Sequence, residues 1–199
     1  VFADFVEKEP ELNPVKYESF SFNAGSQIGD VISAAQSRII QKESLDMPLF
    51  LAATEADSVI NLEYLVTQFR ERFSNPGNAM MIFRDTRKPW PVAQADERIR
   101  FLSSYLPDAN ILEFSHQSLL IAPDNELYGL GAPLQRCLEP NNISLEGCRQ
   151  LPEEDLWFSA WHDTERPVYT SRLTYNPWFD DLAEAVGTFI QANESGEAP

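Results

Sequence analysis

The chain has 199 residues, and 31 acidic residues against 15 Lys and Arg give it a formal net charge of −16 at pH 7. Phosphate binding needs clustered cations, so this balance argues against nucleic acid as a partner. A hydrophobic fraction of 43% is enough to bury a core, which predicts a globular domain rather than a disordered chain. No apolar run approaches the roughly 20 residues of a membrane span, and the first residues do not resemble a signal peptide.

The first half of the sequence begins with an irregular stretch and then passes from helix to strand. Residues 1–25 contain two prolines and show no regular apolar spacing, so we expect an irregular segment there. Apolar residues recur at helical spacing over 28–40, which predicts a helix. The short apolar run at 48–53 predicts a strand buried on both faces of a sheet.

The alternation of helix and strand patterns continues along the chain. From Leu62 the apolar spacing is helical again and ends at the Asn-Pro-Gly breaker at 75–77. Residues 79–83 then predict a second buried strand. The spacing of apolar residues over 99–106 predicts a third helix, and 110–114 predict a third strand.

This β-α-β-α-β order predicts an α/β fold. The connections are long enough for crossovers, so we expect a parallel sheet with helices on its faces. The pattern weakens between 123 and 175, with a possible strand at 168–170. A final helix is marked by Asn176 at its N-cap and Pro177 at its first position, and the tail after residue 192 is expected to be frayed.

The two cysteines, Cys137 and Cys148, bracket a short irregular stretch. They could form a disulfide in an oxidising, extracytoplasmic compartment, or they could be inert thiols in a cytosolic protein. Two cysteines alone do not make a metal site.

An acid and an imidazole follow two of the predicted strands. Asp57 lies just past the strand at 48–53, and His116 lies just past the strand at 110–114. Ligands and chemistry gather at the carboxyl ends of parallel strands, and an Asp that orients a His forms two thirds of a hydrolase triad. The alternative is structural: Asp57 could cap the following helix, and His116 could be a hydrogen-bonded histidine at a sheet edge.

Two stretches of sequence resemble the α/β-hydrolases of the lysophospholipase and monoacylglycerol lipase type. The first runs from Met47-Pro-Leu-Phe-Leu-Ala-Ala to Asp-Ser-Val-Ile60, preceded by Tyr17–Ala24, and the second is Leu112-Glu-Phe-Ser-His-Gln-Ser-Leu-Leu-Ile-Ala-Pro123. This resemblance implies that Asp57 is the triad acid and His116 the catalytic histidine. It covers roughly residues 17–123 and, more weakly, the final helix.

The expected nucleophile is missing from the sequence. The family places its serine in a G-x-S-x-G elbow upstream of the acid, but the one Gly pair of that spacing with a Ser between, Gly25–Gly29, has Gln27 at its centre. Ser26 is better placed to cap the first helix.

We therefore expect the 199 residues to be the carboxyl-terminal part of a longer hydrolase, inactive alone. Residues 1–25 would derive from the cap of such an enzyme, 26–192 would be the carboxyl-terminal part of the hydrolase domain, and 193–199 a disordered tail. The implied substrate is an ester or acylglycerol, with no cofactor. Half a sheet exposes an unpaired edge, so we also expect a homodimer or another association that covers it.

Other interpretations remain open. A binding or assembly module that kept a hydrolase scaffold without catalysis would show the same pattern. A nucleotide-binding domain is disfavoured, because neither G-x-G-x-x-G nor a P-loop is present. His162 is a weaker catalytic candidate, and a zinc site is not expected because the two histidines lack ligand spacing.

Overall fold

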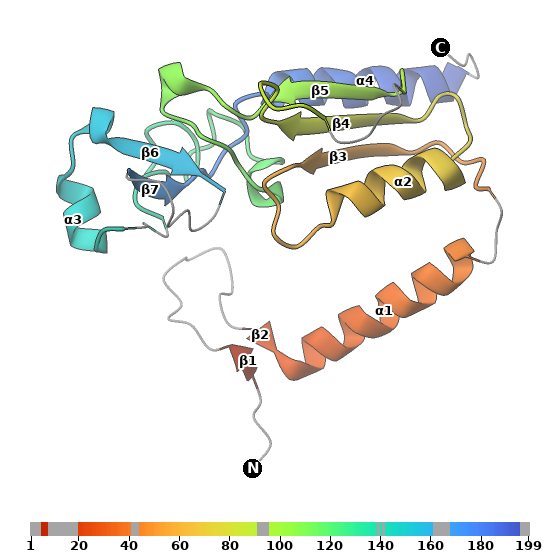
Figure 1. Cartoon of the computed structure of the whole chain (residues 1–199), viewed down its shortest axis with the longest axis horizontal. Helices are drawn as coiled ribbons and strands as arrows, with labels where there is room; N and C mark the ends of the chain where they lie inside the picture. The colour runs from red at the N-terminus through yellow and green to blue at the C-terminus, as the bar shows by residue number, and fades with distance from the viewer. Residues whose placement is uncertain are drawn as a thin grey trace. The chain divides into compact units, whose positions relative to one another are not determined.

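The computed structural model describes residues 5–7, 20–40, 44–90, 96–138, 140, 142–160 and 168–195 (Figure 1). The chain divides into two compact units, Val1–Leu45 and Asp46–Pro199. The boundary between them follows the first helix, whereas the sequence placed a boundary before that helix, at residue 25.

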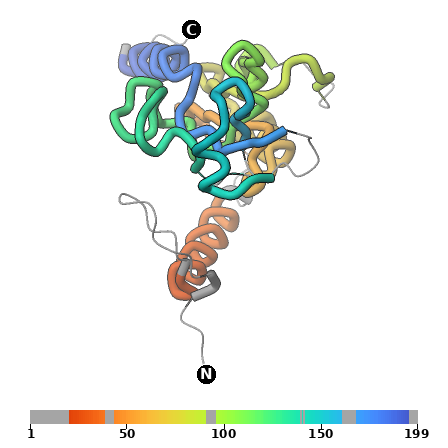
Figure 2. The backbone as a smooth tube through the Cα atoms, turned by 90° about the vertical axis from the view of Figure 1, so that its left-hand side faces the viewer, coloured from red at the N-terminus to blue at the C-terminus, as the bar shows by residue number. Residues whose placement is uncertain are grey.

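The described residues of the first unit form two short paired strands and one long helix. Strand β1 (Phe5–Glu7) pairs antiparallel with β2 (Phe20–Ser21), and α1 (Phe22–Ile40) follows at once as one continuous helix (Figure 2). The sequence predicted irregular chain up to residue 25, with Ser26 as the cap. Instead Ser21 caps the helix, because its hydroxyl accepts the amide hydrogen of Ala24 at 3.2 Å.

The second unit is built on a parallel sheet of three strands in the order β3-β4-β5. Strands β3 (Phe50–Thr54) and β4 (Ala79–Arg84) confirm the two strands predicted at 48–53 and 79–83. Strand β5 (Ile99–Ser103) pairs with the other edge of β4. The chain therefore has the mixed helix and parallel-strand composition of an α/β protein.

The predicted third helix is wrong, because the residues from Ile99 to Ser103 form strand β5. Their helical spacing is overridden by pairing with β4, which satisfies the backbone hydrogen bonds of both strands. Residues 110–114 were also predicted to be a strand, but they do not form a continuous ladder of paired residues. Within this stretch only Ile111 forms isolated bridges, to Leu106 and Phe158. Asn110 explains the interruption, since its φ of 54° is left-handed and does not fit a strand.

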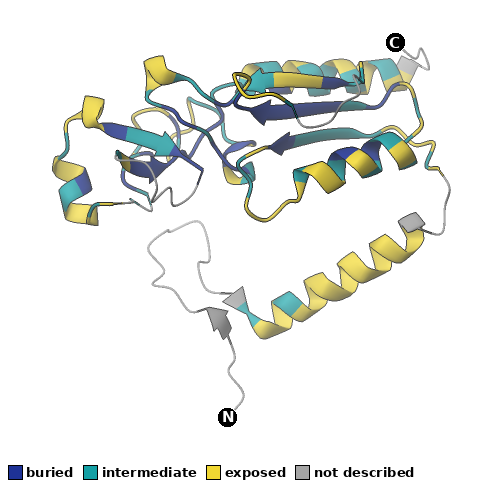
Figure 3. Cartoon of the chain, in the orientation of Figure 1, coloured by how far each residue is buried: buried dark blue, intermediate teal, exposed yellow. Residues whose placement is uncertain are grey.

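Two helices cover the two faces of the sheet, as Figure 1 shows. Helix α2 (Leu62–Arg72) packs Val66 and Phe69 against Met80 and Ile82 on one face. Helix α4 (Phe179–Ser195) packs on the other face, where Met81 and Phe83 point. Successive β4 residues thus face opposite layers, and β4 is the most deeply buried strand of the sheet (Figure 3).

Helix α4 differs slightly from its predicted limits. Asn176 does organise its start, since its side-chain oxygen accepts the amide hydrogen of Trp178 at 2.9 Å, but the helix begins at Phe179 rather than at Pro177. It runs on to Ser195, into the segment predicted as a tail, and residues 196–199 lie outside the described residues. Within the described part of the chain, no helix is long and apolar enough to cross a membrane.

A smaller lobe carries the disulfide. Strands β6 (Leu156–Ser159) and β7 (Tyr169–Arg172) pair in parallel, which confirms a strand near 168–170. Helix α3 (Leu145–Gln150) brings Cys148 to Cys137, and the two form a disulfide buried beside Leu156. The described residues of this unit also contain three short 3₁₀ turns: η1 (Pro107–Ala109), η2 (His116–Ser118) and η3 (Glu153–Asp155).

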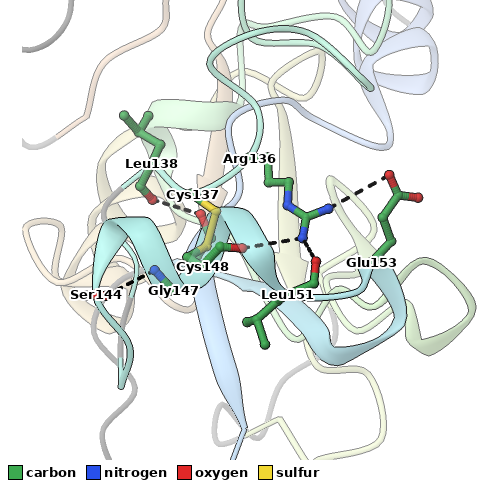
Figure 4. The surroundings of a disulfide bond; sticks show 9 residues. Arg136, Cys137, Leu138, Ser144, Gly147, Cys148, Leu151 and Glu153 are labelled. Atoms are coloured by element: carbon green, nitrogen blue, oxygen red, sulfur yellow. Dashed lines mark hydrogen bonds and ion pairs between the residues drawn. A yellow bond between two sulfur atoms is a disulfide. The ribbon is translucent and has the colours of Figure 1, made fainter.

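Arg136, next to Cys137, reinforces the disulfide loop (Figure 4). Its guanidinium donates to the carbonyl oxygens of Cys148 and Leu151 and lies 3.9 Å from the carboxylate of Glu153. These contacts join the two ends of the loop that the disulfide closes.

We expect the double variant Cys137→Ala/Cys148→Ala to lose about 2 to 4 kcal/mol of unfolding free energy, because an open loop gives the unfolded chain more freedom. Urea unfolding of the variant and of the wild type measures the loss. Wild-type protein under reducing conditions is the control and should shift in the same direction. Equal unfolding midpoints in all three samples would contradict the expectation.

Candidate functional site

Asp57 and His116 meet, although they lie 59 positions apart in the sequence. Nδ1 of His116 lies 2.6 Å from Oδ2 of Asp57. The Asp57 side chain is 1% exposed and that of His116 is 36% exposed. The carboxylate is therefore withdrawn from water while the imidazole remains reachable from outside.

The loop after β3 holds the Asp57 carboxylate in one orientation. Its Oδ1 accepts the amide hydrogens of Val59, at 2.8 Å, and of Ile60, at 3.2 Å. Its other oxygen, Oδ2, faces His116. An ionised carboxylate only accepts hydrogen bonds, so Nδ1 carries the hydrogen of the neutral imidazole and Nε2 keeps its lone pair. This arrangement prepares His116 to act as a general base through Nε2.

Asp57 does not cap the helix that follows, which was the alternative left open by the sequence. The N-cap of α2 is Asn61, whose side-chain oxygen accepts the amide hydrogen of Tyr64 at 2.9 Å. Asp57 is thus free of the capping role, and its side chain is directed to His116.

His116 opens the turn η2 rather than ending a strand. The segment that leads to it is placed by the smaller lobe: Phe158 of β6 accepts the amide hydrogen of Leu112 and donates its own to Asn110, each at 2.8 Å. The predicted position at a strand end is correct for Asp57 and only approximate for His116, because Ile111 alone bridges to β6.

A charged network at the ends of β3 and β4 supports the Asp57 loop, and the sequence analysis missed it. Glu55 lies two residues before Asp57, and its carboxylate accepts the amide hydrogen of Asp85 at 3.1 Å. It also lies 3.6 Å from Nε of Arg84, which is 4% exposed. Arg84 in turn donates to the carbonyl oxygens of Lys88 and Pro89. The sequence feature that could have revealed this network is the pair Arg84-Asp85, directly after the buried strand predicted at 79–83.

Asp85 is the most strongly perturbed acid of this network. The Arg87 guanidinium makes two hydrogen bonds of 2.8 Å to its carboxylate. These bonds are the main reason that the pKa of Asp85 falls from 3.8 to about 2, and burial opposes the shift. The charged form is therefore the stable one in the folded protein.

Among the described residues, no side chain is hydrogen-bonded to Nε2 of His116, whose ring contact is the one that Nδ1 makes with Asp57. His162 lies outside the described residues. Within the part of the chain that is described, no group of three or more His, Cys, Asp or Glu side chains could hold a metal ion.

We compared the chain with protein-family models, curated proteins and solved structures, and none of them matches it. The interpretation of the Asp57–His116 pair thus depends on its geometry. The decisive features are the short hydrogen bond, the withdrawn carboxylate and the reachable imidazole.

We expect Asp85→Asn to lower the stability at neutral pH and to lose this effect in acid. Because the folded-state pKa of Asp85 is depressed, its stabilisation is fully present above about pH 4 and disappears as the pH falls through about 2. Thermal unfolding of wild type and variant across this range measures the difference. The control is Asp108→Asn at an exposed position. If the stability difference between Asp85→Asn and the wild type stays unchanged at the acid end of this range, the lowered pKa of Asp85 is contradicted.

Proposed function

We propose that this chain carries the acid and the base of a serine ester hydrolase whose nucleophile lies in a segment outside these 199 residues. The observation that carries the proposal is the 2.6 Å contact between Nδ1 of His116 and Oδ2 of Asp57. The resemblance to lysophospholipases and monoacylglycerol lipases supports the same assignment for both residues.

In such an enzyme His116 would move two protons in turn. Nε2 takes the proton of the serine hydroxyl as its oxygen attacks the ester carbonyl, and then gives it to the leaving alcohol. A water molecule then attacks the acyl-enzyme and releases the acid, with His116 again accepting and returning a proton. Asp57 stays ionised throughout and stabilises the imidazolium that forms in each half.

An outer edge of the sheet is where the further strands that this proposal requires would add. Strand β3 is an outer strand of the three, and Phe50, Leu51 and Ala52 are only half-buried. Strands that precede this segment would add beside β3, which also places a nucleophile near Asp57 at the carboxyl ends of the strands. The predicted homodimer would cover the same edge, and it stays a prediction.

Exposed apolar side chains that lie close to the pair in the sequence suit an ester or acylglycerol substrate. Val59 follows Asp57 by two residues and Leu120 follows His116 by four, and they are 78% and 84% exposed. Large exposed apolar groups near reacting groups are typical of surfaces that contact apolar ligands. The disulfide would place such an enzyme in an oxidising compartment.

The test uses the reading frame extended upstream of Val1, treated with a fluorophosphonate probe and with a nitrophenyl ester. We expect one serine adduct, in a G-x-S-x-G motif roughly one hundred residues before Asp57, and none on the 199-residue chain. His116→Ala and Asp57→Asn should each lower kcat by roughly 10⁴-fold, as loss of a triad member does.

Two variants serve as controls for this experiment. Asp96→Asn removes another acid that is paired with arginine, just before the amino end of β5, and His162→Ala removes the other histidine; both should keep the turnover. Absence of any adduct or turnover in the extended protein would overturn the proposal and favour a binding module on a hydrolase scaffold. An adduct on the 199-residue chain would place the nucleophile inside it.

A further inference from the structure

We propose that Ser118 and Asn176 are positioning residues that hold the His116 ring opposite Asp57. Their contribution to catalysis depends on the proposed function, whereas their effect on the ring does not. Both side chains are polar and fully buried, at 0% exposure, and both bind the turn that carries His116.

The His116 turn has little stability of its own. Turn η2 spans three residues, and its internal hydrogen bonds are those of a single 3₁₀ turn, from Ser118 to Ser115 and from Leu119 to His116. Fixing each backbone residue in one conformation costs conformational entropy. The turn therefore needs contacts from elsewhere to keep one conformation.

The segment 173–176, between β7 and α4, supplies these contacts. The Ser118 hydroxyl donates to the carbonyl oxygen of Leu173 at 2.6 Å. The side-chain amide of Asn176 donates to the carbonyl oxygen of Leu119 at 3.1 Å, and its backbone amide donates to that of Ile121 at 2.8 Å. The five residues after His116 thus make three hydrogen bonds, all of them with the segment 173–176.

That segment is itself fixed at both ends. Leu173 donates its amide hydrogen to the carbonyl oxygen of Ser159 in β6, at 2.9 Å. At the other end Asn176 organises the start of α4, and the Trp178 indole donates to the carbonyl oxygen of Ser103 in β5, at 2.7 Å. The Asp57 loop is anchored to the same sheet through β3, so both members of the pair are held to one framework.

The structure offers a matched control for Ser118. Ser171 is also buried, at 1% exposure, and its hydroxyl also donates to a backbone carbonyl oxygen, that of Leu138 at 2.9 Å. That bond ties β7 to the disulfide loop and does not touch the His116 turn. Ser118→Ala and Ser171→Ala therefore remove the same chemical group from equally buried sites.

The experiment is NMR of the 199-residue chain labelled with ¹⁵N-histidine, with His162→Gln identifying the signals of His116. Above neutral pH we expect the wild-type ring to carry its hydrogen on Nδ1. Ser118→Ala and Asn176→Asp should speed exchange of that hydrogen with water about tenfold, the factor that one lost hydrogen bond supplies. Ser171→Ala should leave the exchange rate unchanged.

All spectra are recorded at a temperature at which circular dichroism shows every variant folded. Asn176→Asp keeps the shape and the acceptor oxygen, replaces the donor to Leu119 with a second carboxylate oxygen and adds a buried charge, so it decides the matter, once it is shown to be folded, if Ser118→Ala does not fold. Wild-type exchange in both Ser118→Ala and Asn176→Asp would overturn the proposal. So would equal acceleration in Ser171→Ala, which would indicate a general loosening.

A second measurement separates this proposal from the proposed function. In the upstream-extended protein, Ser118→Ala should lower kcat about tenfold at unchanged KM, and Ser171→Ala should lower neither. If His116→Ala keeps full turnover, the proposed function fails while the NMR result still decides the positioning role. If His116→Ala is inactive and Ser118→Ala matches the wild type in both measurements, only the positioning role fails.

Discussion

Strand β4 lies between β3 and β5, and the two ladders of backbone hydrogen bonds that it makes are the constraint on which the rest of the fold depends. Five of its six residues are buried, so every amide and carbonyl group must find a partner inside the protein. Pairing on both edges meets this requirement and fixes the register of its neighbours. The register in turn places the ends of β3 and β4 side by side, where Glu55 reaches the amide of Asp85.

The acid and the base of the candidate site are held by different means. Asp57 is oriented locally, since the amides of Val59 and Ile60 bind one carboxylate oxygen. His116 sits on a short turn that is fixed by residues distant in sequence, in β6 and in the segment before α4. The geometry of the pair is therefore as dependent on the smaller lobe as on the central sheet.

Two arginines of this acidic chain lie at the ends of strands in the central sheet. Arg84 ends β4, lies beside Glu55 and stacks over Trp90, 5.1 Å from the ring centroid. Arg98 precedes β5, pairs with Asp96 and donates to the carbonyl oxygen of Phe73. An arginine can satisfy carbonyls and a carboxylate at once, which suits positions where a ladder ends and backbone groups lack partners.

By itself the sequence determined the elements whose patterns are local. The apolar runs that became β3 and β4, the periodicity of α1 and α2, and the role of Asn176 just before α4 all follow from residue spacing and capping chemistry. It also marked Asp57 and His116 as candidates, because both lie after buried segments. Only the tertiary structure decided that residues 99–103 are a strand, since pairing with β4 outweighs their helical spacing. It alone brought Asp57 and His116 into contact, because a contact across 59 residues depends on how β3, β6 and the segment before α4 are packed, which local patterns do not encode.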